Sequence, residues 1–600
     1  MGDVAHLIAR FLKERSVDRV FSLCGGHILP IWDPVHCMGI PIVDVRDERA
    51  AVHMAHAHRE LTGRLGVALV TAGPGLTNAV TGIANAHVSR VPILVISGVP
   101  PRPQENMGAL QAVPQAEMVR PITRYARTVS RAEHVLRELD EAVSCAEGHC
   151  NEPGPAFIDF PTDLLREEIP EAFVDPSRFR AREPVRIIPS AGTLGAAVKI
   201  LWQAQRPLVI SGRGARGAEP ELLKILDGLG CVYMDTAESR GLVPEDHPAY
   251  MPAMRARAMQ EADAVLTVGR TLDFQLGYGS EAVFPHASFV RIGISASELR
   301  GNRRAHVELF GSAQETLEAL MKAAKGARPA TDRSWIEEMQ SADRGRRQGL
   351  VQKLADAPPG NDGAMHPYRL LGHVRDSLKE DAIVVADGGD FLSFARVALS
   401  GAAYLDCGAF GCLGVGVPFG IASALAFPNR QVVVVSGDGS FGFNAIELDT
   451  CRRHKARVVF IVANNGGWNI ERNDQKEAYG GRIVGTELEG CDYAMLARSM
   501  GVYGERIERP EDLPDALKRS FDEAPALLDV MVTRDAVSPD ALAGLPGIPD
   551  RQALSTWDEW EGRRKAQGVR RKAQGVRYEE ERSSNRNLIT ATENGRLPNE

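Results

Sequence analysis

The chain has 600 residues, of which 44% are hydrophobic and 25% are charged, and its formal net charge is −8. This composition is typical of a soluble globular protein and excludes a largely disordered chain, and the acidic balance gives no reason to expect nucleic acid as a partner. No apolar run approaches the roughly 18 residues of a membrane span, and the first residues lack the apolar core of a signal peptide. The nine cysteines are scattered and never spaced as CxxC, so we expect reduced thiols in a cytoplasmic protein.

Short β-branched runs alternate with longer helical patterns as far as about residue 535, which predicts parallel α/β sheets. The linkers expected at 178–189 and 326–333 divide the chain into three doubly wound parallel-sheet domains, at residues 1–176, 190–326 and 360–535. The expected strands are residues 19–23, 41–45, 66–71 and 92–97 in the first domain, 207–211, 264–269 and 288–292 in the second, and 382–387, 431–436, 457–463 and 526–532 in the third.

The sequence changes character in the last segment, residues 538–600. The heptapeptide RRKAQGV occurs twice, at 563–569 and 570–576, and the basic stretch around it contains no acid. Two interpretations stay open: a solvated helix or tail, or a basic C-terminal helical lid that covers an anionic ligand.

A glycine-rich turn follows the expected strand at 207–211. Residues 212–217 read GRGARG and Asp235 lies about 20 residues further on, which is the dinucleotide-binding fingerprint in its usual context. An NAD-dependent oxidoreductase is therefore one interpretation, ADP binding by the arginines of the turn is a second, and a turn that binds nothing is a third. No paired acid and base is evident that would serve a nicotinamide, which disfavours the dehydrogenase.

The strongest chemical signal lies at the ends of two consecutive expected strands. The sequence GDGS at 437–440 follows the first strand, and Asn465 follows the second, 27 residues after Asp438. Because the carboxyl ends of parallel strands meet at one edge of a sheet, these side chains should converge. One carboxylate and one amide oxygen, completed by the carbonyl of Gly467 and by diphosphate oxygens, would form a Mg²⁺ site, and the glycines expose amides to phosphate.

This pair of motifs resembles the diphosphate-binding motif of the thiamine diphosphate enzymes, and the resemblance covers about residues 1–535. It is similar to the acetolactate synthase-like branch, which includes benzaldehyde lyase and the 2-hydroxyacyl-CoA lyases. The resemblance implies a pyrimidine-binding, a middle and a diphosphate-binding domain, in this order, and the cofactors thiamine diphosphate and Mg²⁺. It also implies a cofactor shared between subunits, and hence a homodimer at least and a homotetramer as the expected assembly.

The resemblance assigns roles in the first domain. Glu48 follows the expected strand at 41–45 and matches the family's essential glutamate, which shares a proton with the aminopyrimidine ring of the cofactor. The turn TAGPGLTN at 71–78 matches the family's turn after the next strand. The cofactor-binding residues implied here are Gly26, Thr71, Gly73 and Asn78.

In the third domain, GCLG at 411–414 resembles the segment that bends the cofactor, with Leu413 as the apolar wedge between its two rings. Gly411 would accept the hydrogen bond of the 4′-amino group through its carbonyl. The cofactor-binding residues implied in this domain are Gly388, Gly389, Asp390, Gly411, Leu413, Gly437, Gly439, Ser440, Trp468 and Asn469, and the metal ligands are Asp438, Asn465 and Gly467.

Five further residues bear on the reaction. Benzaldehyde lyase and one branch of the 2-hydroxyacyl-CoA lyases resemble this chain in carrying a histidine at His27, where acetolactate synthases have a small apolar residue. Gln111 resembles a glutamine near the cofactor, and both residues would polarise the reacting intermediate. Glu471, near the start of an expected short helix, would take and return a substrate proton. Leu110 and Ile470 would narrow the substrate pocket.

These features predict a thiamine diphosphate-dependent 2-hydroxyacyl-CoA lyase. It would reversibly cleave a short-chain 2-hydroxyacyl-CoA, for example 2-hydroxyisobutyryl-CoA, to formyl-CoA and a ketone or aldehyde. The alternative is a benzaldehyde lyase- or acetolactate synthase-like carboligase that acts on free aldehydes or 2-oxo acids. A non-catalytic nucleotide-binding subunit would rest on residues 212–217, and the joint presence of Glu48, Asp438 and Asn465 speaks against it.

Overall fold

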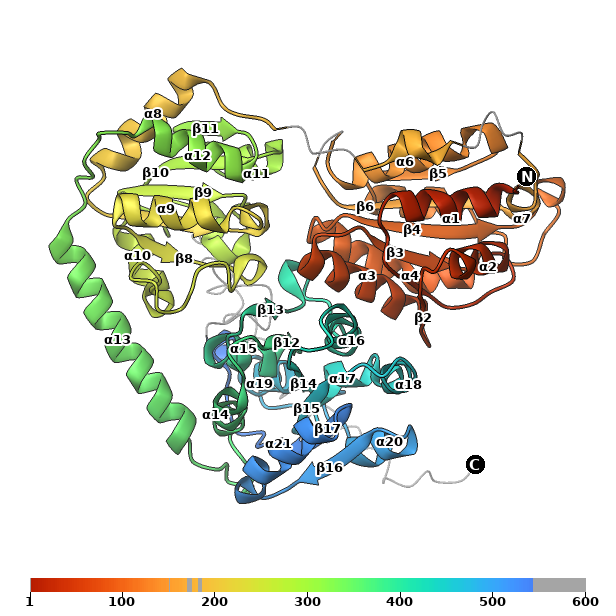
Figure 1. Ribbon diagram of the computed structural model, residues 1–600. Helices are drawn as coiled ribbons and strands as arrows, with labels where there is room; N and C mark the ends of the chain where they lie inside the picture. The colour runs from red at the N-terminus through yellow and green to blue at the C-terminus, as the bar shows by residue number, and fades with distance from the viewer. Residues whose placement is uncertain (1, 150–151, 170–174, 182–185, 543–600) are drawn as a thin grey trace, which may run out of the picture.

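The computed structural model describes residues 2–149, 152–169, 175–181 and 186–542. Within these residues, three parallel β-sheets of six, five and six strands follow one another along the chain, with helices packed around each (Figure 1). This confirms the predicted class of three parallel-sheet α/β domains. We call them the first, middle and third domains.

The first domain contains a sheet with the strand order β2-β1-β3-β4-β6-β5, in which every pair is parallel. Its strands are β1 (Val20–Ser22), β2 (Ile42–Asp44), β3 (Gly66–Val70), β4 (Ile93–Val99), β5 (Tyr125–Thr128) and β6 (Pro155–Pro161). Its helices are α1 (Val4–Glu14), α2 (Leu29–Cys37), α3 (Glu48–Thr62), α4 (Pro74–Val88), α5 (Gln115–Val119), α6 (Val135–Ala146) and α7 (Thr162–Leu165).

The middle domain contains a sheet with the order β11-β10-β9-β7-β8, also parallel throughout. Its strands are β7 (Pro207–Ser211), β8 (Val232–Met234), β9 (Ala264–Val268), β10 (Ser288–Gly293) and β11 (Val307–Phe310). Its helices are α8 (Ala191–Gln203), α9 (Glu219–Leu229), α10 (Arg255–Glu261), α11 (Ala296–Arg300) and α12 (Ala313–Ala323).

A helix of 24 residues, α13 (Arg333–Asp356), connects the middle and third domains along the outer side of the molecule (Figure 1). Asp332 caps its start by accepting hydrogen bonds from the amides of Ser334 and Trp335. Trp335 packs in a hydrophobic cluster of the middle domain, whereas Leu354, near the other end, packs in the cluster of the third domain. The helix therefore belongs to both domains.

The third domain contains a parallel sheet with the order β13-β12-β14-β15-β17-β16. Its strands are β12 (Ile383–Asp387), β13 (Ala403–Leu405), β14 (Val432–Gly437), β15 (Val459–Asn464), β16 (Tyr503–Ile507) and β17 (Ala526–Met531). Its helices are α14 (Pro367–Ser377), α15 (Asp390–Ala398), α16 (Gly416–Ala426), α17 (Asp438–Gly442), α18 (Leu448–Arg453), α19 (Asn469–Ala478), α20 (Tyr493–Ser499), α21 (Leu513–Asp522) and α22 (Pro539–Leu542).

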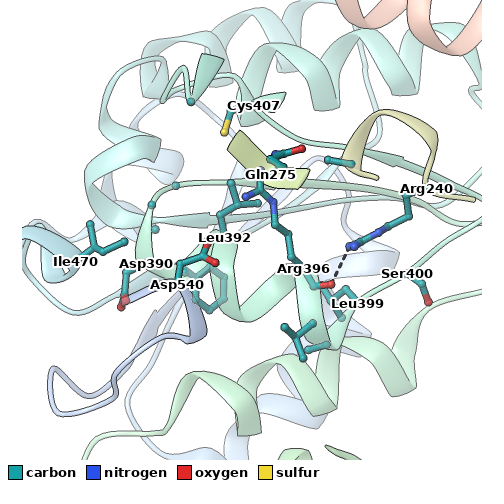
Figure 2. Close-up of a pocket in the computed structure, with 18 of the residues that line it drawn as sticks. Arg240, Gln275, Asp390, Leu392, Arg396, Leu399, Ser400, Cys407, Ile470 and Asp540 are labelled. Atoms are coloured by element: carbon teal, nitrogen blue, oxygen red, sulfur yellow. Dashed lines mark hydrogen bonds between the residues drawn. The ribbon is translucent and has the colours of Figure 1, made fainter. Parts of the chain in front are cut away.

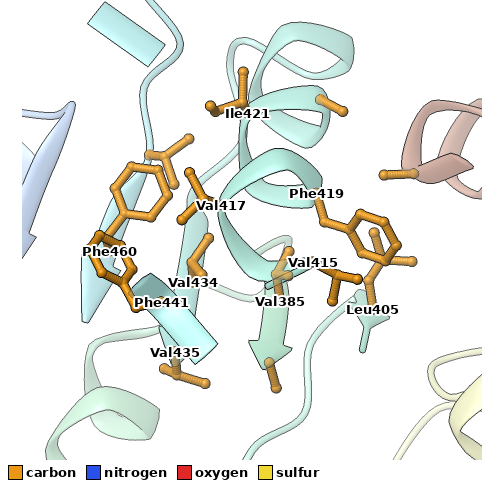
Figure 3. Close-up of a cluster of buried hydrophobic side chains, with 14 of the residues drawn as sticks. Val385, Leu405, Val415, Val417, Phe419, Ile421, Val434, Val435, Phe441 and Phe460 are labelled. Carbon is orange, nitrogen blue, oxygen red and sulfur yellow. The ribbon is translucent and has the colours of Figure 1, made fainter. Parts of the chain in front are cut away.

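Helix α16 joins the cores of the first and third domains. Figure 3 shows Val417 and Ile421 of this helix on the side of β14 and Phe460, and Phe419 on the opposite side. The ring of Phe419 lies 5.1 Å from that of His56 and 6.1 Å from that of His53, both on α3. Since α16 is apolar on all sides, it is buried between two domains, and this fixes α3 against the third domain.

The predicted C-terminal lid falls almost wholly outside the described residues, which end with Leu542 in α22. In the part of the chain that the structure describes, no helix combines the length and apolar character needed to cross a membrane.

Candidate active site

The carboxyl ends of β14 and β15 form the edge at which the GDGS motif and Asn465 meet. Asp438 begins α17 directly after β14, and its carboxylate accepts a hydrogen bond of 3.1 Å from the amide of Gly467, which follows β15. The side chain is 3% exposed, and burial raises the pKa of Asp438 to about 6. The Oδ1 atom of Asn465 is buried without a hydrogen-bond partner. The segments that contain Asp438 and Asn465, which were predicted to converge, thus meet at this edge through the contact of Asp438 with Gly467.

These oxygens fit a magnesium ion. A carboxylate, an amide oxygen and a backbone carbonyl are hard ligands of the kind Mg²⁺ takes together with phosphate oxygens. A buried and unpartnered amide oxygen at Asn465 is costly unless something binds it, which favours a cation at this position. Among the described residues no group of three or more His, Cys, Asp or Glu side chains gathers as a metal site, so this set uses a single carboxylate.

Close packing at Gly439 requires a residue without a side chain. A Cβ atom there would lie 2.6 Å from Cζ3 of Trp468, whose ring also contacts Phe443 edge-on at 6.2 Å. Gly388, at the end of β12, has φ +121°, a conformation that favours glycine. The two glycine turns therefore bring backbone amides close to the space beside Asp438, as a bound diphosphate requires.

Asp387 holds the turn at residues 411–414, which the resemblance identifies as the segment that bends the cofactor. Its carboxylate accepts hydrogen bonds from the amides of Gly416 at 2.8 Å and Gly414 at 3.3 Å, so it holds the turn that includes Leu413. The side chain is 1% exposed, and burial raises the pKa of Asp387 to about 6. The Asp387 carboxylate is therefore directed to this turn.

A cavity of about 1030 Å³ opens beside these residues, between the third and middle domains. Figure 2 shows Ile470 and Asp390 at one end of it and Arg240 at the other. All the third-domain residues singled out in the sequence line this cavity: Gly388, Gly389, Asp390, Gly411, Leu413, Gly437, Asp438, Gly439, Ser440, Asn465, Gly467, Trp468, Asn469, Ile470 and Glu471.

Charge is distributed unevenly along the cavity. The third-domain end carries the carboxylates of Asp390, Asp438, Glu471 and Asp540, and partial desolvation raises the pKa of Glu471. The remaining wall, formed by the middle domain, α13, α14 and α15, carries six arginines against the two carboxylates of Asp235 and Glu245. The arginines are 240, 255, 346, 347, 375 and 396. One end of the cavity therefore suits a metal ion, and the other suits an anion.

Glu48 begins α3 and is 5% exposed. Its carboxylate accepts a hydrogen bond of 3.1 Å from the side-chain amide of Asn78 on α4, and burial raises the pKa of Glu48 above its ordinary value. A Cβ atom on Gly75 would lie within 3.2 Å of both Glu48 and Thr71, so the two side chains flank this glycine. The structure thus gathers Glu48, Thr71 and Asn78, and Glu48 is poised to hold a proton.

The loop with His27 packs beside the same turn. Burial lowers the pKa of His27, opposed by a side-chain hydrogen bond with Gln111, so the imidazole is neutral near pH 7. Gln111 has φ +64°, and its carbonyl oxygen would lie 2.7 Å from a Cβ atom on Gly73. The added Cβ atom of Gly26 would meet open space, and Leu110 is 78% exposed. This half of the site faces outward from the chain.

The sequence analysis missed Gln115, which organises this half of the site. Its side-chain oxygen accepts a hydrogen bond of 2.6 Å from the amide of Gly73, and its side-chain nitrogen donates to Asp159 at 2.9 Å. Gln115 is 2% exposed. Nothing in the sequence distinguishes it from Gln111, four residues earlier, because the difference lies only in which side chain points inward.

The eight first-domain residues predicted for the site do not line the cavity. Among the described residues, that lining comes from the middle and third domains and from α13 between them. Within one chain, the structure therefore forms two separate halves of the predicted site: the first half-site, around Glu48, His27 and Gln111, and the second half-site, around Asp438 and Asn465.

The GRGARG turn of the middle domain, residues 212–217, forms hydrogen bonds and ion pairs with other residues of the chain. The amides of Gly212 and Gly214 donate to the carbonyls of Val268 and Gly269 at 3.0 and 3.1 Å, and Arg213 and Arg216 both pair with Glu60 of α3. The amides are thus not available to a diphosphate, and the turn joins the middle domain to the first. This arrangement does not support the predicted ADP site.

Comparison with known protein families identifies the class of the protein. Residues 2–118 match the thiamine pyrophosphate enzyme N-terminal TPP binding domain, residues 194–320 match the central domain, and residues 389–530 match the C-terminal TPP binding domain. The chain therefore belongs to the thiamine diphosphate (thiamine pyrophosphate) enzymes, as the resemblance implied.

Several characterised relatives span almost the whole chain. The acetolactate synthase large subunit IlvG of Mycobacterium tuberculosis is 34% identical over 545 residues, 89% of this chain and 96% of that protein. The 2-hydroxyacyl-CoA lyase 2 of Caenorhabditis elegans is 32% identical over 562 residues, 87% of each chain. The human 2-hydroxyacyl-CoA lyase 2 is 31% identical over 578 residues, 88% of this chain and 89% of that protein. The chain is thus a thiamine diphosphate-dependent carbon–carbon lyase or carboligase.

Proposed function

We propose that this protein is a 2-hydroxyacyl-CoA lyase. It cleaves a short-chain 2-hydroxyacyl-CoA, such as 2-hydroxyisobutyryl-CoA, to formyl-CoA and a ketone or aldehyde, and it also runs in reverse. The observation that carries the proposal is the cavity, in which an arginine-rich wall adjoins the proposed cofactor site. Relatives named 2-hydroxyacyl-CoA lyase 2 or 1, at 30–32% identity, support it.

The arginines of this wall suit the phosphate groups of coenzyme A. Arg255 donates to the backbone carbonyls of Asp235 and Gln275, and Arg346 donates to that of Ala253. Because these partners are neutral, both guanidinium groups leave positive charge at the cavity wall. A free 2-oxo acid has no group that would need a basic region so far from the reacting carbon.

The proposed reaction requires a cofactor, and it requires that one proton move from the 2-hydroxyl group of the substrate to the carbon that becomes the formyl group. Bound thiamine diphosphate supplies a nucleophilic carbon that attacks the substrate carbonyl and accepts electrons when the adjacent carbon–carbon bond breaks. Asp438, Asn465 and the carbonyl of Gly467 would hold its Mg²⁺, and Glu48 would share a proton with its aminopyrimidine ring. Glu471 takes the proton of the 2-hydroxyl group and returns it to the formyl carbon, so atoms and charge balance.

His27 and Gln111 belong to the first half-site and polarise the substrate oxygen, with Leu110 at the rim. Since the two half-sites are separate within one chain, the proposed enzyme is a homodimer at least, in which the first half-site of one subunit meets the second half-site of its partner. Ile470, on α19 beside Glu471, narrows the pocket toward short acyl groups.

Turnover of 2-hydroxyisobutyryl-CoA, compared with that of the free 2-hydroxy acid, tests the proposal. We expect formyl-CoA and acetone from the thioester and no cleavage of the free acid. In the variants Arg255→Ala and Arg346→Ala the KM for the thioester should rise about tenfold or more, the loss expected for one charge-assisted contact. Equal KM values in the variants and the parent would contradict the CoA assignment.

A second candidate is condensation of 2-oxo acids, which the Mycobacterium tuberculosis relative favours. In that case pyruvate would yield acetolactate at a rate that neither arginine variant changes. His27 disfavours it, because acetolactate synthases resemble this loop with a small apolar residue at that position.

A further inference from the structure

One segment of the third domain contacts the first-domain backbone close to Glu48. This segment runs from the η11 turn (Ala445–Glu447) through α18 to His454, and it meets the end of β2 and the start of α3. The guanidinium of Arg453 donates to the carbonyl of Asp44 at 2.7 Å, and Nε2 of His454 lies 2.7 Å from the Asp44 carboxylate. The two residues are therefore anchors for the end of β2, four residues before Glu48.

Glu447 makes the contact nearest to Glu48. One carboxylate oxygen accepts hydrogen bonds from the backbone amides of Arg46 and Asp47, each at 3.0 Å, and the other accepts from the hydroxyl of Thr450 at 2.6 Å. The side chain is fully buried, with 0% exposure. Since Asp47 is the N-cap of α3, this carboxylate fixes the two amides that directly precede the helix carrying Glu48.

Arg49 is held on the other side of Glu48. Its guanidinium donates to the carbonyl of Phe443 at 2.8 Å and to the side-chain oxygen of Asn444 at 3.3 Å, and it also lies over the Phe443 ring. Asn444 in turn donates to the carbonyl of Gly414, in the turn that Asp387 holds. Glu48 therefore stands between two residues, Asp47 and Arg49, that are both fastened to the third domain.

We propose that Glu447 is a positioning residue for Glu48. It fixes the backbone immediately before α3, and so it sets where the Glu48 carboxyl lies relative to Asn78. Its only described partners are Thr450 and the Arg46 and Asp47 amides, so it acts through Glu48 rather than on the substrate. The inference rests on the role proposed above for Glu48, and it adds a residue that lies outside the cavity and both half-sites.

The variant Glu447→Leu tests the proposal in the full-length protein. The leucine side chain fills a similar volume and has no acceptor oxygen, so the Arg46 and Asp47 amides lose their shared partner. We expect kcat for 2-hydroxyisobutyryl-CoA to fall about 10- to 100-fold, because small misplacement of a reacting group has effects of this size. KM and the affinity for thiamine diphosphate should stay within about twofold.

Thr450→Val is the matched control. It removes the hydroxyl that donates to the same carboxylate and accepts from Arg453 at 3.2 Å. Both contacts of Glu447 with the first domain stay in place, as does the hydrogen bond from Arg453 to the Asp44 carbonyl, so kcat should stay within about threefold of the parent. Amide hydrogen exchange, measured by mass spectrometry without cofactor or substrate, should be at least about tenfold faster at residues 46 and 47 in Glu447→Leu, and unchanged in Thr450→Val.

Unchanged exchange at residues 46 and 47 in the Glu447 variant would overturn the inference. Faster exchange with an unaltered kcat would also overturn it. So would a rise in KM together with a loss of affinity for thiamine diphosphate, because these changes indicate a general disturbance of the site. If Glu447→Leu does not fold, Glu447→Asp, which withdraws the carboxylate by one methylene from the Arg46 and Asp47 amides, should give the same loss confined to kcat. An unaltered kcat in that variant would overturn the proposal. Failure of the proposed function shows separately, because the parent would then not cleave 2-hydroxyisobutyryl-CoA, whatever the exchange rates at residues 46 and 47 are.

Discussion

Replacing Gly439 with alanine should strain the second half-site by a predictable amount. The added Cβ atom would lie 2.6, 2.8 and 2.9 Å from three carbons of the Trp468 ring, whereas ordinary contact begins at 3.4 Å. The ring must therefore move by about 0.8 Å, and overpacking of this kind costs about 1–3 kcal/mol. Because Trp468 directly precedes α19, the shift would also displace Ile470 and Glu471.

Gly442→Ala, in the same short helix, is the control. Its added Cβ atom would lie 3.9 Å from the hydroxyl of Tyr493, which is ordinary contact, and the loss of a helical glycine should stabilise the protein by about 0.5–1 kcal/mol. The two variants should therefore differ in urea stability by about 1.5–4 kcal/mol, read by tryptophan fluorescence. Gly439→Ala should also lose about 10²-fold in kcat. Equal stability and equal activity of the two variants would refute the steric argument.

Three further predictions concern the half-sites and their supports. Gln115→Leu leaves the Gly73 amide without its acceptor and should lower stability by about 1–3 kcal/mol; an unchanged urea midpoint would contradict this. Burial raises the pKa of Asp159 to about 6, above its unfolded value, so this carboxyl should contribute a fall in stability of about 3 kcal/mol as the pH rises from about 4 to about 6, which then levels off. Asp159→Asn should remove this contribution from the pH dependence of urea stability, whereas the contributions of Asp387 and Asp438, whose pKa values are also raised to about 6, should remain. Treatment with EDTA should abolish activity and Mg²⁺ should restore it, and Asn465→Ala should raise the Mg²⁺ concentration required about tenfold, whereas an unchanged requirement would argue against this ligand.

The strands that the sequence predicted are mostly those in the interior of each sheet. Buried parallel strands read as continuous β-branched runs, as in β14 and β15, and such runs are easy to recognise. The strands β5, β11, β13 and β16 were not predicted, and each lies at the edge of its sheet, where one side is less enclosed and the pattern is weaker. The interior strand β6, Pro155–Pro161, was missed as well, because it begins and ends with proline.

Local sequence patterns likewise predicted only some of the site residues. Asp438 and Asn465 could be predicted because each follows a recognisable strand, and the parallel fold brings such positions to one edge. The contacts of Gln115 with Gly73 and of Glu447 with Arg46 join segments 42 and 401 residues apart, respectively. No local pattern marks them, since they depend on which side chains turn inward once the domains have packed.

Helix α13 fixes the distance between the middle and third domains, because its two ends pack against these domains. At about 1.5 Å per residue its 24 residues extend about 36 Å, and Arg346, Arg347, Leu350 and Val351 in its central part form one wall of the cavity. A single inserted residue would turn everything beyond it by about 100°, so Trp335 and Leu354 would no longer face their two clusters together. The width of the cavity is thus set by the length and rotation of α13 as much as by the residues that line the cavity.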